Sequence, residues 1–154
     1  MTIERVETLD DPRLLPYRDL KDRDLAGKHG LFIAEGEYIV SRLLQSSLTT
    51  ASVLVVEHRA EAMRAIAPAD VPVFAASESQ ISQVIGYKFH LGVLACGKQP
   101  QPLSVDAVTE AHTLIVCPTI FNNENLGLII RNAAALGADG MLVGRKGTLL
   151  FARR

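Results

Sequence analysis

Three residues near the carboxyl end of the chain have the types and spacing of an anion site. Asn125 is expected directly before an amphipathic helix, with Gly127 at the turn and Arg131 on the first turns of the helix. An asparagine amide can cap free helix N–H groups, and a glycine lets the backbone approach a ligand closely. A guanidinium beside a helix N-terminus favours a phosphate. The alternative is a simple cap followed by a surface arginine.

Two apolar segments flank this helix and predict its neighbours. TLIVC (113–117) reads as a strand that enters the turn, and GMLVG (140–144) as a strand that follows the helix. Ligands of open α/β sheets bind at the carboxyl edge of the strands, which is where the turn would lie. The segment is not a GxGxxG fingerprint, so it does not support a nicotinamide cofactor. An unrelated α/β enzyme that cradles a nucleotide phosphate remains an alternative.

The amino-terminal half alternates between apolar strands and amphipathic helices. Ser77 and Gln80 have the spacing of a capping box, and Gly86 is placed to end the same helix. Such alternation predicts an α/β fold with parallel strands and right-handed crossovers. The expected strands are residues 31–36, 51–57, 71–77 and 91–97, and the expected helices are residues 37–47, 61–70 and 77–86.

A polar stretch with two prolines divides the chain. KQPQPLSVDAVT follows the last expected strand, which places a linker at residues 98–111. The domains are then residues 1–97 and residues 112–154. The first thirty residues mix acids and bases densely, and Leu15, Leu20 and Leu25 among them predict a short surface helix.

Two groups of cations are candidates for contact with nucleic acid. Lys88 stands in a loop with Tyr87, Phe89 and His90, where aromatic rings could stack on unpaired bases. The alternative is a plain loop whose Phe89 packs inward. The other group is interleaved with aspartates, so that a solvated, salt-bridged face is equally compatible with it; its members are Arg18, Lys21, Arg23 and Lys28.

Composition bounds the class of protein. The chain has 154 residues, of which 48% are hydrophobic and 21% charged, as in ordinary globular domains. A formal net charge of −1 means that any RNA contact must come from local patches. Cys96 and Cys117 have no ligand-spaced partners, which favours buried thiols and no metal site. No apolar run is long enough to span a membrane and the start is no secretory signal, so a cytoplasmic protein is expected.

The segment NENLGLIIRNAAALGADGMLV resembles the first motif of the SpoU-type (TrmH-like) RNA 2′-O-ribose methyltransferases of the SPOUT superfamily. The amino-terminal half is similar to the substrate-binding domain of that family, in GLFIAEGEYIVSRLL and in LGVLACG. That domain resembles ribosomal-protein RNA-binding modules of three-layer α/β type. The motif is met by Asn125, Gly127, Arg131, Ala134 and Gly137.

The resemblance implies an RNA substrate-binding domain at residues 1–97 and the first part of a SPOUT (α/β knot) domain at residues 112–154. The two later family motifs, which build the knot and hold S-adenosylmethionine, have no counterpart in the sequence. The resemblance therefore implies a carboxyl-terminally truncated chain that has no cofactor pocket and is inactive alone.

For the intact protein, the resemblance implies methyl transfer from S-adenosylmethionine to a ribose 2′-hydroxyl of tRNA or rRNA by a homodimer. Arg131 would act at the ribose and its adjoining phosphate, with Asn125 shaping the site. A non-catalytic RNA-binding module is the alternative of a different class.

Overall fold

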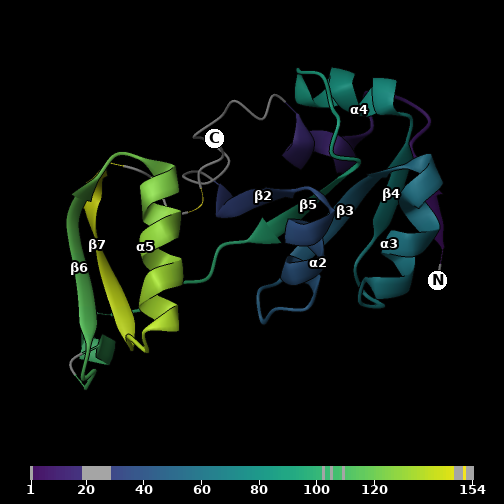
Figure 1. Cartoon of the computed structure of the whole chain (residues 1–154). Helices are drawn as coiled ribbons and strands as arrows, with labels where there is room; N and C mark the ends of the chain where they lie inside the picture. The colour runs from purple at the N-terminus through teal and green to yellow at the C-terminus, as the bar shows by residue number, and fades with distance from the viewer. Residues whose placement is uncertain are drawn as a thin grey trace. The chain divides into compact units, whose positions relative to one another are not determined.

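The computed structural model describes residues 2–18, 29–101, 103–104, 106–108, 110–147 and 151. The chain forms two compact units, and the division falls between Pro100 and Gln101. Figure 1 shows the sheet and helices of the first unit in purple to teal and those of the second in green to yellow.

The first unit is built on a five-stranded sheet with the order β1-β4-β3-β5-β2. The β1–β4 and β4–β3 pairs are parallel, whereas β5 runs antiparallel to both β3 and β2. The expectation of an all-parallel sheet is therefore wrong for β5. The strands are β1 (Ile3–Arg5), β2 (Leu31–Glu35), β3 (Thr50–Val56), β4 (Val73–Ala76) and β5 (Val93–Lys98).

The direction of β5 follows from where the chain leaves the preceding helix, α4. α4 (Glu78–Ile85) has only eight residues, and its end at Gly86 adopts a left-handed conformation with a φ of 79°. The loop that follows returns to the edge where β3 ends, and the backbone N–H of Val56 donates to the carbonyl of Gly92 there. The chain thus enters β5 from the carboxyl edge of β3 and runs back along it.

Helices cover both faces of this sheet, so the unit has the expected three-layer α/β architecture. α2 (Glu37–Leu44) and α3 (Ala60–Ile66) pack on a core that includes Val53, Val73 and Val93. α4 and the 3₁₀ helix η1 (Pro12–Tyr17) pack on the opposite core, around Leu54, Phe74 and Leu94. Alternate residues of each strand face opposite sides of a sheet, which is why neighbouring strand residues serve different cores.

Local signals in the sequence explain several element boundaries. Ser77 accepts from the backbone N–H of Gln80 at 3.2 Å, and the Gln80 side chain accepts from the Ser77 N–H at 2.9 Å, which confirms the capping box. α3 ends at Ile66, before Pro68. The surface helix was predicted from Leu15, Leu20 and Leu25. Leu15 lies in the short 3₁₀ helix η1, whereas Leu20 and Leu25 lie outside the described residues.

The second unit contains one parallel strand pair and one long helix. β6 (Leu114–Ile120) and β7 (Gly140–Gly147) pair in parallel, with Leu114 opposite Gly140. α5 (Asn123–Ala135) connects them and lies over one face of the pair (Figure 1). Both predicted strands are confirmed, and each is longer than its apolar run. A short 3₁₀ helix, η3 (Asp106–Val108), precedes β6.

Among the described residues, no helix is both long and apolar enough to cross a bilayer.

Candidate functional site

The start of α5 is capped by Asn122. Its side chain accepts from the backbone N–H of Asn125 at 2.9 Å, and Asn122 itself has an extended backbone conformation. Asn125 is therefore inside the first turn, and the prediction that it precedes and caps the helix is wrong by one turn. Two asparagines precede Glu124, and the cap falls on the first of them. An asparagine accepts from the amide two or three residues ahead, which fits Asn122 and Asn125.

Arg131 is the ninth residue of α5, so it lies in the third turn and not on the first turns as expected. Helical side chains lean toward the N-terminus of their helix. The Arg131 guanidinium accordingly reaches back one turn, and a β-carbon at position 127 would lie 3.3 Å from its Nη1. Arg131 is exposed, and so is Asn125. The glycine thus leaves room for the guanidinium on an open face of the helix.

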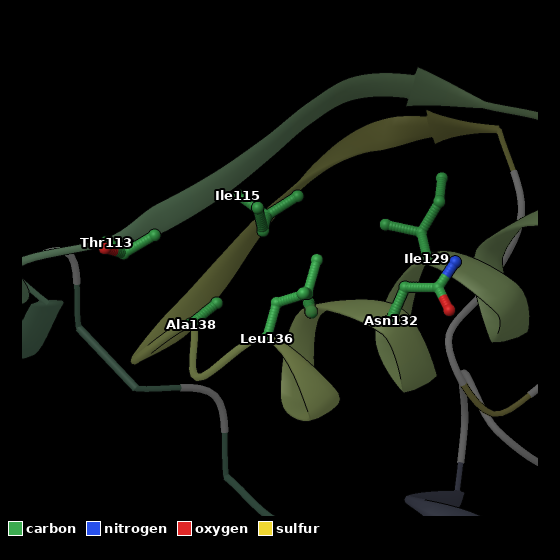
Figure 2. Close-up of a pocket in the computed structure, with 7 residues that line it drawn as sticks. Thr113, Ile115, Ile129, Asn132, Leu136 and Ala138 are labelled. Carbon is green, nitrogen blue, oxygen red and sulfur yellow. The ribbon is translucent and has the colours of Figure 1, made fainter.

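An open apolar cavity of about 280 Å³ lies between α5 and the strand pair. Figure 2 shows Ile129 and Asn132 of α5, with the C-cap residue Leu136, on one side of it and Ile115 of β6 on the other. Asn132 supplies the one side-chain amide, and Thr113 the one hydroxyl. Arg131 is not among the lining residues. The cavity and the guanidinium are therefore separate features of α5.

Arg18 and Lys88 are the expected RNA-contacting cations that the structure describes, and both belong to the first unit, whereas Arg131 belongs to the second. Arg18 donates to the carbonyl of Leu9 and pairs with Asp10 at 3.4 Å. Its Nε is buried without a partner among the described atoms. Lys88 is exposed and forms no ion pair within the described part of the chain. The other expected cations, Lys21, Arg23 and Lys28, lie outside the described residues.

The loop that carries Lys88 presents fewer aromatic rings than its sequence suggests. Phe89 is fully buried in the core, as the plain-loop alternative expects. Tyr87 is half-buried, and its hydroxyl donates to the Glu35 carboxylate at 3.3 and 3.4 Å. Among the described residues of this unit, the exposed aromatic side chain is instead Tyr38, at 74% exposure. Its helical spacing from Val40, Leu43 and Leu44, which face the core, could have shown this.

Both cysteines are free thiols. Burial raises the pKa of Cys96 to about 11, while Cys117 is only half-buried. No cluster of His, Cys, Asp and Glu side chains in the described ranges has the makings of a metal site. The described residues thus offer an exposed arginine on α5 and an apolar cavity beside it, with no metal centre.

No family model matches the chain. A protein of Mycobacterium tuberculosis described as an uncharacterized tRNA/rRNA methyltransferase is 39% identical in an alignment of 141 residues. The alignment covers 88% of this chain and 49% of that protein. An AdoMet-bound rRNA methyltransferase from Sinorhizobium meliloti matches with a TM-score of 0.75 and 25% identity, over 97% of this chain and 57% of its own. The SpoU methyltransferase AviRb from Streptomyces viridochromogenes matches with a TM-score of 0.66 and 20% identity, over 90% and 53%.

The two α/β units therefore share their fold with solved SpoU methyltransferases. In sequence, the chain is related to proteins described as tRNA/rRNA methyltransferases. The chain spans about half the length of the curated relatives that it matches.

The cavity beside α5 does not fit S-adenosylmethionine. That cofactor carries an ammonium, a carboxylate and a sulfonium, which need polar or charged partners when buried. The lining consists of aliphatic side chains with Thr113 and Asn132, and none of these residues is charged. We therefore assign no cofactor contact to the described residues.

Proposed function

We propose that the protein transfers a methyl group from S-adenosylmethionine to a ribose 2′-hydroxyl of ribosomal or transfer RNA. Kinship over 88% of the chain to a named tRNA/rRNA methyltransferase supports the class of reaction. A solved RNA 2′-O ribose methyltransferase with a TM-score of 0.63 supports the ribose as acceptor. The observation that carries the proposal is the exposed Arg131, with its guanidinium held over Gly127.

In this proposal the two units have different roles. Residues 1–97 form the RNA substrate-binding domain, residues 98–111 the linker, and residues 112–154 the beginning of the methyltransferase domain. The three-layer architecture of the first unit and the strand–helix–strand order of the second support this division. The cofactor would supply the methyl group, and this chain supplies RNA contacts and the arginine.

Arg131 is proposed to act on the RNA by electrostatics. A ribose hydroxyl is a weak nucleophile near neutral pH, and an arginine stays protonated there. A guanidinium beside the 2′-oxygen and the adjoining phosphate would favour the deprotonated oxygen. The open face of α5 supports this role, because a sugar–phosphate can reach the side chain without displacing protein.

Asn125 is proposed to shape one side of the same site. It lies six residues before Arg131, which places the two side chains about 120° apart around the helix axis. Asn125 can therefore border a ligand that Arg131 binds, but it does not stand beside the guanidinium. Its loss should affect the reaction less than the loss of Arg131.

The proposed RNA-contacting cations of the first unit are Arg18, Lys21, Arg23, Lys28 and Lys88. Lys88 is the best supported of those described, because it is exposed and unpaired within the described part of the chain. Arg18 is the least supported, since its guanidinium is engaged by Leu9 and Asp10.

A homodimer is also part of the proposal. The second unit exposes large apolar side chains that a second copy could cover. They lie on β6, on α5 and just beyond their ends, at Val116, Phe121, Leu128, Ile130 and Leu136.

The experiment uses protein from the longest reading frame that contains these residues. It is incubated with ribosomal or transfer RNA and S-adenosylmethionine carrying a tritiated methyl group, and label in the RNA is counted. We expect transfer by the wild type and a loss of at least about a hundredfold for Arg131→Ala, the scale of removing one transition-state donor. Arg5→Ala, at an exposed arginine of edge strand β1, should match the wild type. Equal rates for Arg131→Ala and the wild type would reject the assigned role.

A further inference from the structure

We propose that Tyr38, with Leu91 and Arg42, forms a surface on the first unit that binds an unpaired RNA base by stacking. This inference rests on the proposed function, since it names which part of the RNA the first unit binds and which side chains bind it.

The surface lies at one edge of the five-stranded sheet. β2 and β3 both run antiparallel to β5, so that their carboxyl ends meet the beginning of β5. Two backbone hydrogen bonds close this edge, from the Gly36 N–H to the Val93 carbonyl at 2.9 Å and from the Val56 N–H to the Gly92 carbonyl at 3.0 Å. The first turn of α2 and the residues before β5 are thereby held side by side.

Large apolar side chains are exposed on both of these segments. Tyr38 is 74% exposed and Leu91 is 52% exposed, and Ile39 is half exposed beside them. Leu91 packs toward α2, because a β-carbon at Gly36 would lie 3.6 Å from its Cδ1. An exposed ring flanked by aliphatic groups suits a flat nucleobase, which has an apolar face and polar edges.

The charges around Tyr38 are compatible with RNA. Arg42 follows Tyr38 by one helical turn and is exposed on the same side of α2, where it can meet the phosphate of a stacked nucleotide. Lys88 lies three residues before Leu91 and is also exposed.

The nearby carboxylates are mostly engaged by protein groups. Glu37 pairs with Arg59 at 2.8 Å, and Glu78 lies 3.9 Å from Nδ1 of His90. Glu35 accepts from Tyr87. Glu57 is exposed and adds one negative charge at this edge. Positive and negative groups therefore nearly balance here, and stacking, not charge, would dominate the binding.

This balance gives a sharp expectation for salt. Contacts to phosphates weaken steeply as salt rises, because they release counterions. Removal of a stacking contact through Tyr38 should instead lower RNA affinity by a similar factor at low and at high salt. The salt slope itself should change little in a Tyr38 variant.

The test measures fluorescence anisotropy of the protein with a labelled RNA hairpin that has an unpaired purine loop, and with a fully paired duplex of the same stem. We expect Tyr38→Ala to weaken hairpin binding about five- to one-hundredfold, the range for one base stacked on an aromatic ring. Tyr38→Phe should bind like the wild type, since it keeps the ring. Ile66→Ala is the control, because Ile66 is exposed at the far end of α3. The duplex should respond to none of these changes.

Several results would overturn the inference. The inference would be wrong if Tyr38→Ala bound the hairpin as tightly as the wild type does. This would hold even if the variant changed association with a protein. An equal loss for the duplex would also overturn the inference, because it would show a backbone contact. If the wild type bound neither RNA, the proposed function itself would fail, which is a different outcome.

Discussion

Arg131 and Gly127 are four residues apart on one face of α5, and each constrains the other. A β-carbon at position 127 would lie 3.3 Å from Nη1 of Arg131, which is closer than ordinary van der Waals contact. Because Gly127 has no side chain, the guanidinium has room to lie at this position. Gly127 does not need a left-handed backbone, since its φ is not positive.

We predict that Gly127→Ala separates stability from activity. Alanine in a helix interior should stabilise the protein by roughly 0.5–1 kcal/mol relative to glycine. The added methyl group should displace the guanidinium and slow methyl transfer, though less than Arg131→Ala does. Urea denaturation and the methyl-transfer assay measure the two effects. A variant that is more stable and fully active would show that the position of the guanidinium does not matter.

The two thiols should differ strongly in reactivity. The thiolate is the reactive form, and burial raises the pKa of Cys96 to about 11, so that at neutral pH this group is almost entirely protonated. Cys117 is half-buried on β6 and should react first with a thiol reagent. Labelling followed by mass spectrometry should find Cys117 modified in the folded protein and Cys96 modified only in denaturant. Rapid labelling of Cys96 under native conditions would contradict the described core.

At the scale of elements, local signals were readable and long-range pairing was not. The capping box of Ser77 and Gln80 depends on residues three apart, so the sequence alone predicts the start of α4. The antiparallel direction of β5 depends on where the loop after Gly86 returns to the sheet, which no short pattern encodes. β1, with only three residues, has too few positions to show an alternation, and it was not predicted.

The site shows the same division. The residue types of Asn125, Gly127 and Arg131 pointed to α5, but the turn at which each falls depended on which asparagine caps the helix. Tyr38 was not among the predicted site residues, although its helical spacing from the core residues Val40, Leu43 and Leu44 is compatible with its exposure. A pattern of apolar residues gives a core face, and its borders are settled only by packing.

We predict that Ser77→Ala destabilises the first unit by about 1 kcal/mol, because the N–H of Gln80 then loses its cap. Ser79→Ala is a matched control, since Ser79 is an exposed residue inside α4 and alanine favours helices. Urea denaturation followed by circular dichroism would measure both variants. Equal midpoints for the two variants would mean that the box contributes nothing to stability.

At the scale of the whole molecule, the two units differ in how well they bury apolar surface. The first unit has a core on each face of its sheet. In its described part, the second has one long helix, α5, over one face of β6 and β7, and it leaves Leu136 87% exposed and Phe121 79% exposed. Exposed apolar patches of this kind mark association surfaces. This contrast supports the proposal of a second copy at the second unit.

We predict that the chain self-associates through the second unit. Sedimentation velocity at micromolar concentration should show a dimer, and Phe121→Ser with Leu136→Ser should shift it toward monomer. Ile66→Ser, on α3 of the first unit, should leave the distribution unchanged. A wild type that is monomeric at these concentrations would contradict the prediction.

The most direct test of the account identifies the methylated atom. RNA treated with S-adenosylmethionine and protein from the longest reading frame containing these residues would be digested to nucleosides and analysed by mass spectrometry. We predict one nucleoside that carries its new methyl group on the ribose, present with the wild type and Arg5→Ala and absent with Arg131→Ala. A methyl group on a base, or an unchanged yield with Arg131→Ala, would contradict the claim that this arginine serves ribose methylation.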